Sequence, residues 1–132
     1  MEPATKKTHL SGHFRKRVSA FSAAFKGLYF GWKEGIHFRF HLISVLLVIV
    51  AGTWLNVNSF EWCLLAFACG LVILTELINT AIEILSDRVT MEFDPLIGKV
   101  KDLSAAAVLI SALTALIIGG IIFWPKLMER FQ

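Results

Sequence analysis

The sequence predicts an all-α integral membrane protein, with an amphipathic helix on the membrane surface followed by three transmembrane helices. Composition is the first reason: 56% of the 132 residues are hydrophobic and 17% are charged, outside the usual range of soluble proteins. The second is that apolar residues gather in long runs, while most basic residues precede the first run. The length fits a single domain over residues 1–132.

The N-terminal third predicts the surface helix. Residues 1–12 are polar and are expected to be disordered. Over residues 14–33, large apolar side chains recur at steps of three and four, namely Phe14, Val18, Phe21, Phe25, Leu28, Tyr29 and Trp32. This spacing places them on one helical face. A basic helix with such a face lies in the plane of a membrane surface, although a soluble helix packed on a partner protein has the same pattern.

Three further segments are predicted to cross the membrane, at residues 36–56, 60–86 and 103–124. The uncharged run 42–55 covers only about 21 Å of helix, against a hydrocarbon core of about 30 Å. The first span must therefore begin near Ile36, with Arg39 and His41 reaching back to the headgroups. In the third span, small residues and the pair Gly119 and Gly120 allow close helix packing.

The distribution of Lys and Arg predicts the orientation. These residues are frequent before the first span, absent from the loop between spans one and two, and present again in the loop that precedes the third span. By the positive-inside rule the N-terminus and the second loop face the cytoplasm, and the C-terminus faces outward. Anionic lipid headgroups, rather than nucleic acid, explain the basic N-terminus.

The second span carries polar residues at a helical spacing. At about 100° per residue, its three carboxylates and one amide fall within an arc of about 80°. They are Glu76, Asn79, Glu83 and Asp87. A charge at the bilayer centre costs at least about 2.5–3.5 kcal/mol, so cations, protons or a ligand must compensate this stripe. Interhelical hydrogen bonds made by protonated Glu are the structural alternative.

Across the second loop, Lys101 and Asp102 are expected to start the third span, where the helix dipole favours anions. Carboxylates able to hold Mg²⁺, a base and a Lys are the parts that phosphoryl transfer needs. The chain contains no Walker motif. On spacing alone, phosphoryl transfer remains one option, and a proton- or ion-conducting oligomer is another. The pair His37 and His41 has a spacing compatible with zinc, but no third ligand is in register.

A longer string of residues resembles a known family. It comprises Glu76-Leu-Ile-Asn79-Thr-Ala-Ile-Glu83, a following Asp87, and then Lys101-Asp102-Leu-Ser-Ala-Ala-Ala-Val-Leu109. This string resembles the small prokaryotic diacylglycerol kinases and the related undecaprenol kinases, over about residues 17–126. The resemblance implies a homotrimer in the bacterial cytoplasmic membrane with active sites between subunits. It further implies transfer of the ATP γ-phosphate, with Mg²⁺, to the hydroxyl of a membrane lipid.

The resemblance also implies a role for each residue. Glu76 looks like the general base and Glu83 like a Mg²⁺ ligand. The catalytic residues that it implies are Glu76, Asn79, Lys101 and Asp102. The nucleotide-binding residues are Arg17, Asp87, Lys101 and Asp102. The neighbouring Arg15 and Lys16 leave the register at Arg17 open.

One position departs from the family pattern. The family has a second metal-binding Glu four residues before the basic residue that matches Arg39, where this chain has Gly35. The nearest carboxylate, Glu34, is displaced by about 100° on a helix. Local unwinding at Gly35 would let Glu34 serve as a metal ligand. Otherwise metal binding rests on Glu83 alone and the chain is a weakened homologue. The residues do not decide between diacylglycerol and undecaprenol as the acceptor.

Overall fold

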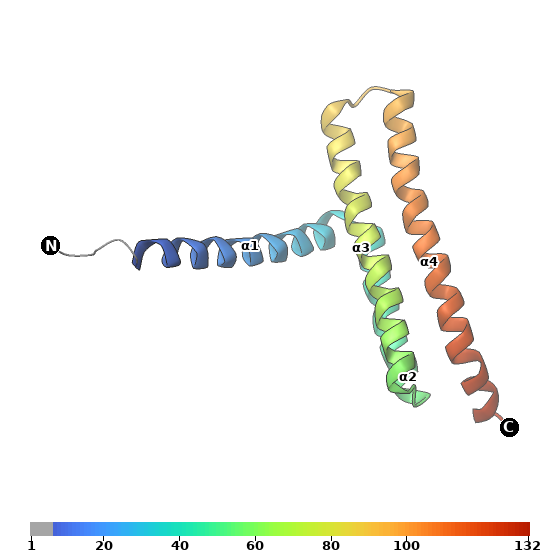
Figure 1. The fold of residues 1–132 in the computed structure, drawn as a ribbon. Coiled ribbons are helices and arrows are strands. Elements are labelled where there is room, and N and C mark those ends of the chain that lie inside the picture. The colour runs from blue at the N-terminus through green and yellow to red at the C-terminus, as the bar shows by residue number, and fades with distance from the viewer. Residues whose placement is uncertain (1–6) are drawn as a thin grey trace.

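The computed structural model describes residues 7–132, with side chains from Ser19 onward. This part of the chain contains no strand and four helices, α1 (Lys7–Glu34), α2 (Ile36–Trp54), α3 (Ser59–Val89) and α4 (Pro95–Arg130). Helices α2, α3 and α4 form an elongated bundle, and α1 projects sideways from it (Figure 1). All three bundle helices are long and apolar enough to cross a membrane. The predicted architecture is therefore confirmed.

Helix α2 begins at Ile36 as expected, whereas α1 begins earlier than expected and α3 and α4 are longer than the predicted spans. Helix α1 begins at Lys7, so the expected disorder of residues 7–12 is wrong, whereas residues 1–6 lie outside the described part. Propagating an existing helix adds one hydrogen bond per residue, and no proline stands between Pro3 and Pro95 to stop it. Helices α3 and α4 contain 31 and 36 residues. At about 1.5 Å per residue, both are longer than the hydrocarbon core is thick.

The chain turns from α1 into α2 at Gly35. Gly35 has φ −91° and ψ 102°, so the helix is broken there, and Arg39 bridges the break. The Arg39 guanidinium donates to the carbonyl oxygens of Trp32 (2.7 Å) and Lys33 (2.9 Å). These carbonyls end α1 and have no helical partner of their own, so Arg39 of α2 acts as a cap for α1.

This junction packs directly against α3. A Cβ atom at Gly31 would meet the side chain of Leu77 at 2.7 Å. A Cβ atom at Gly35 would stand 2.8 Å from the carbonyl oxygen of Gly31 and 3.5 Å from Thr80 Oγ1. Both glycines are buried, and their missing side chains allow the approach. As a result, α1 leaves the bundle level with residues 77–80 of α3.

Side-chain caps define the starts of α3 and α4. Asn58 and Glu61 form a capping box, in which each side chain accepts from the other residue's backbone N–H at 3.0 and 2.8 Å. Asn56, just before, has a positive φ of 50°, a conformation that Asn tolerates in turns. At α4, the Asp94 side chain accepts from the N–H groups of Leu96 and Ile97, and Pro95 occupies the first turn.

Helices α3 and α4 run antiparallel and are joined by polar contacts along their whole length. From the α3–α4 loop to the opposite end, these are Asp87–Lys101 (3.0 Å), Asn79–Ser104 (2.6 Å), Thr75–Ser111 (2.8 Å) and Glu61–Lys126 (3.1 Å). They set the register of the two helices: the middle of α3, near Glu76, faces the segment of α4 between Ser104 and Ser111. A small apolar core of Val57, Leu65 and Ile122 closes the end beside the α2–α3 turn.

Candidate active site

The polar stripe of α3 changes from buried to exposed along the helix. Glu76 and Asn79 retain only 3% and 5% of their exposure. Glu83 is half-buried, and Asp87 is exposed close to the α3–α4 loop. The stripe therefore leads from the interior of the bundle, where α1 departs, toward the end that carries the α3–α4 loop (Figure 1).

The centre of the stripe is a hydrogen-bonded network. The Asn79 amide donates from Nδ2 to Glu83 Oε1 at 3.1 Å, and its Oδ1 accepts from the Ser104 hydroxyl at 2.6 Å. Ser104 belongs to α4 and is also buried. In the part of the chain whose side chains are described, the second oxygen of Glu83 has no hydrogen-bond partner. One carboxylate oxygen is thus held by the protein while the other is free for a ligand.

Glu76 differs from the other carboxylates. It is almost fully buried, yet no donor among the described side chains reaches its carboxylate. Its carboxylate oxygens keep a small contact with solvent, because none of the fully buried side-chain N and O atoms in the described residues lacks a hydrogen-bond partner. The structural alternative was interhelical hydrogen bonding by protonated Glu, but among the described side chains neither Glu76 nor Glu83 makes such a bond. The interhelical bond at this level joins Asn79 to Ser104. Glu76 is consequently available to react with a hydroxyl that approaches it.

The predicted cation Lys101 meets Asp87 near the α3–α4 loop. Its Nζ lies 3.0 Å from Asp87 Oδ1, and both side chains are more than a third exposed. The expectation that Lys101 and Asp102 begin the third membrane helix is wrong. Asp94 caps α4 and Pro95 opens it, so Lys101 lies nearly two turns inside the helix, away from the dipole end. Asp102 is exposed.

The remaining site residues are not brought to this network by the single chain. Glu34 ends α1 and is exposed, although Gly35 does unwind as one alternative required. The side chain of Arg17 lies outside the described side chains. Among the described residues, no three His, Cys, Asp or Glu side chains gather as a metal centre. Mg²⁺ is commonly held by one or two carboxylates together with substrate phosphates, so the free oxygen of Glu83 suits that role.

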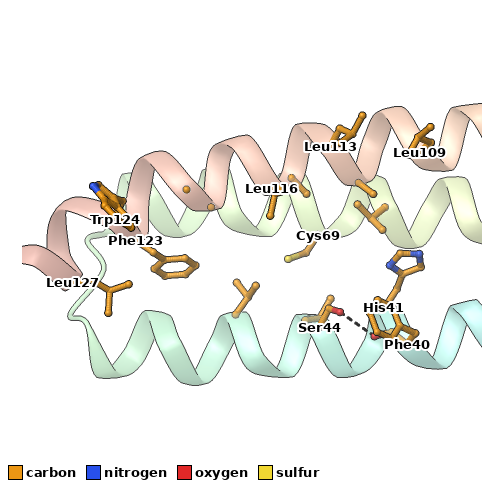
Figure 2. Close-up of a pocket in the computed structure, with 17 residues that line it drawn as sticks. Phe40, His41, Ser44, Cys69, Leu109, Leu113, Leu116, Phe123, Trp124 and Leu127 are labelled. Atoms are coloured by element: carbon orange, nitrogen blue, oxygen red, sulfur yellow. Dashed lines mark hydrogen bonds between the residues drawn. The ribbon is translucent and has the colours of Figure 1, made fainter.

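An apolar groove runs between α2 and α4 with α3 as its floor (Figure 2). Its volume is about 580 Å³. Phe123, Trp124 and Leu127 line the end beside the α2–α3 turn, and His41 and Ser44 line the other end. Val72 forms part of the floor, and Glu76 follows it one turn later on nearly the same face of α3. The groove therefore leads toward the buried carboxylate.

Sequence reasoning missed the hydroxyl residues of α4. Ser104 and Ser111 look like small packing residues in the sequence, but each bonds to a polar residue of α3. A signal was present, because Ser104 follows Lys101 by one turn and thus shares its face of α4. Without the α3–α4 register, however, no partner for Ser104 could be assigned.

Comparison with known proteins identifies close relatives. The family described as prokaryotic diacylglycerol kinase matches residues 22–123. A diacylglycerol kinase of Escherichia coli K12 is 36% identical over 111 residues, covering 84% of this chain and 91% of that protein. A diacylglycerol kinase of Helicobacter pylori 26695 is 36% identical, over 89% of this chain and 85% of the relative. An undecaprenol kinase of Bacillus subtilis 168 is 33% identical, over 82% and 88%.

Proposed function

Because the chain belongs to the prokaryotic diacylglycerol kinase family, it is a multi-pass membrane lipid kinase that uses ATP, and we propose how its residues divide the reaction. The observation that carries the proposal is the burial of Glu76 to 3% exposure without a donor among the described side chains. A general base must be free to accept the proton that it removes. Glu76 meets this requirement, whereas Glu83 is already engaged with Asn79.

The acceptor lipid approaches from the bilayer. Its hydrocarbon chain occupies the apolar groove, and its hydroxyl lies level with Glu76. The chain passes from one apolar medium into another, so close van der Waals contact with the groove, rather than the hydrophobic effect, holds the lipid there. His41 is half-buried at the end of the groove opposite Phe123 and Trp124, and it lies beside the lipid headgroup.

ATP approaches from water at the opposite end of the stripe. Lys101, Asp87, Asp102 and Arg17 face its phosphates, and Glu83 binds Mg²⁺ through its free oxygen. When bound, Mg²⁺ neutralises charge that develops on the phosphates. The lipid oxygen forms a bond to the γ-phosphorus while the bond between this phosphorus and the β–γ bridging oxygen breaks. The hydroxyl proton passes to Glu76, and ADP leaves.

A transfer assay tests this assignment. The purified protein in lipid nanodiscs receives γ-³²P-ATP with either diacylglycerol or undecaprenol, and labelled lipid is counted after extraction. We expect Glu76→Gln to lower the rate by at least about 100-fold, the scale of general-base catalysis, without changing the KM for ATP. Full activity of Glu76→Gln would refute the base assignment. The lipid that is labelled identifies the acceptor, and transfer to neither would favour a weakened homologue.

We further propose that the protein is a homotrimer of the bacterial inner membrane with its N-terminus in the cytoplasm. The distribution of Lys and Arg supports this orientation. Most of the surface of α2 and α4 is exposed in the single chain, which leaves room for neighbouring copies. A Cys at Asn56, in the α2–α3 turn, should react with a membrane-impermeant maleimide from the periplasmic side only. Labelling from the cytoplasmic side alone would reverse the topology.

A further inference from the structure

The buried hydroxyl of Ser104 has a role that its size does not suggest. It reaches from α4 to Asn79 Oδ1 at 2.6 Å, and its own exposure is only 7%. Its other contact, to the carbonyl oxygen of Lys101 one turn earlier, is longer at 2.9 Å. Both oxygens can only accept, and the single hydroxyl proton of Ser104 is directed to the nearer one, Asn79 Oδ1.

The two contacts of Asn79, to Ser104 and to Glu83, fix the position of its amide. With Oδ1 turned to Ser104, the NH₂ group necessarily points along α3 to Glu83 Oε1, at 3.1 Å. The reversed amide would place oxygen against the Glu83 carboxylate, where two acceptors repel each other. Glu83 therefore sets the orientation of the amide, and Ser104 anchors the amide oxygen from the opposite side.

From this geometry, and building on the proposed kinase function, we propose that Ser104 is a positioning residue for the metal ligand Glu83. Ser104 holds Asn79, and Asn79 holds one oxygen of Glu83 so that the other faces the phosphate region. Groups that orient a metal ligand in this way contribute about 10–100-fold to metal affinity. Removing the Ser104 hydroxyl frees the amide to rotate and loosens the carboxylate.

A second hydroxyl contact between the same helices offers a matched control. Ser111 of α4 meets Thr75 Oγ1 at 2.8 Å, and its exposure is 3%. Like Ser104, it also reaches a carbonyl oxygen of its own helix, that of Val108, at 2.8 Å. Ser111→Ala thus removes the same kind of buried interhelical contact as Ser104→Ala, but Thr75 has no link to Glu83.

The experiment measures Mn²⁺ binding by electron paramagnetic resonance on the full chain in nanodiscs, without ATP or lipid substrate. We expect Ser104→Ala to weaken Mn²⁺ binding about tenfold. Ser104→Thr, which keeps the hydroxyl, should bind nearly as the wild type does, and so should Ser111→Ala. Should Ser104→Ala fail to fold, Ser104→Cys keeps the volume with a much weaker donor and should show the same loss. In the kinase assay, the KM for the lipid should stay unchanged in the Ser104 variants, which general damage to the bundle would not allow.

The variant Glu83→Gln distinguishes failure of the positioning role of Ser104 from failure of the metal site at Glu83. If Glu83→Gln abolishes Mn²⁺ binding while Ser104→Ala and Ser104→Cys bind as the wild type does, the positioning role is refuted and the metal site stands. Equal losses in Ser104→Ala and Ser111→Ala would also overturn the role, because they would point to general loosening of the bundle. If Glu83→Gln leaves Mn²⁺ binding intact, the metal assignment of the proposed function fails instead.

Discussion

At the scale of single residues, Gly35 stands where the family resemblance predicts a metal-binding Glu. In place of the expected Glu there is a buried residue without a side chain, against the carbonyl oxygen of Gly31 and the side chain of Phe38. The structure therefore has no room at this position for the missing carboxylate. Whether Glu34 replaces it stays a prediction, since Glu34 is exposed and contacts none of the site residues in the described chain.

Substitution of this glycine tests how closely the junction is packed. The Cβ of Gly35→Ala would stand 2.8 Å from Gly31 O and 3.0 Å from Phe38 Cβ, so the backbone must shift. We expect a loss of about 1–3 kcal/mol in the free energy of unfolding, the usual effect of overpacking. Gly27→Ala in α1 is the control, because nothing lies within 4 Å of its Cβ. The free energy of unfolding of each variant is measured in mixed micelles with increasing SDS. Equal stability of the two variants would contradict the close packing.

The polar residues of the site show what sequence can and cannot predict. Helical spacing alone put Glu76, Asn79, Glu83 and Asp87 on one face, and the structure agrees, because this periodicity is a property of one helix. Contacts between helices could not be predicted from the sequence. The partner of Ser104 depends on how α4 is shifted along α3, which side-chain contacts spread over both helices determine together.

At the scale of elements, the predicted types were right, and α2 and α3 begin within one residue of the predicted spans, whereas α1 and α4 begin earlier than expected. The four helices follow from apolar runs and periodicity. Helix α4 begins well before the predicted span because Asp94 and Pro95 start it in the loop, and α1 begins early because nothing stops it. Membrane spans are recognised by hydrophobicity, whereas helices continue until a cap or a turn ends them.

The groove between α2 and α4 yields a prediction about the lipid. Ala112→Trp places a large ring among the groove-lining residues, and we expect the KM for the lipid to rise about tenfold. That factor corresponds to about 1.4 kcal/mol of lost van der Waals contact between the lipid chain and the groove. The KM for ATP should not change.

Ile117→Trp is the control for this groove. Ile117 is exposed, does not line the groove, and points about 140° away from Ala112 around α4. Kinase assays with varied lipid at saturating ATP compare the two variants. An effect of the same size from Ile117→Trp would show that the groove does not hold the lipid.

At the scale of the whole molecule, the direction of α1 bears on how the sites are built. Helix α1 leaves the bundle at Glu34 and leads away from it (Figure 1). Arg17 belongs to this helix, and seventeen residues of helix separate it from Glu34, about 25 Å along the axis. Arg17 is therefore distant from Lys101 of its own chain. A role at the nucleotide requires that it serve the site of a neighbouring copy.

Mixing two inactive variants tests this arrangement. Arg17→Ala and Glu76→Gln subunits, unfolded and reassembled together in micelles, should recover part of the wild-type kinase rate, because some sites then combine an intact Arg17 with an intact Glu76. Each variant reassembled alone should remain inactive. No recovery in the mixture, with native mass spectrometry showing three chains per particle, would mean that each site takes both residues from one chain.

Because burial changes along α3, the activity of the enzyme should depend on the bilayer around it. From Asp87 to Glu76 the helix rises about 16 Å, so the site extends from water, through the headgroups, into hydrocarbon. Each substrate can then stay in its own solvent while their reactive ends meet. The depth of Glu76 relative to the lipid headgroups is set by how the fixed length of α2 matches the bilayer. Activity should accordingly follow hydrophobic mismatch, with an optimum at one acyl-chain length of the host lipid and a decline on either side of it.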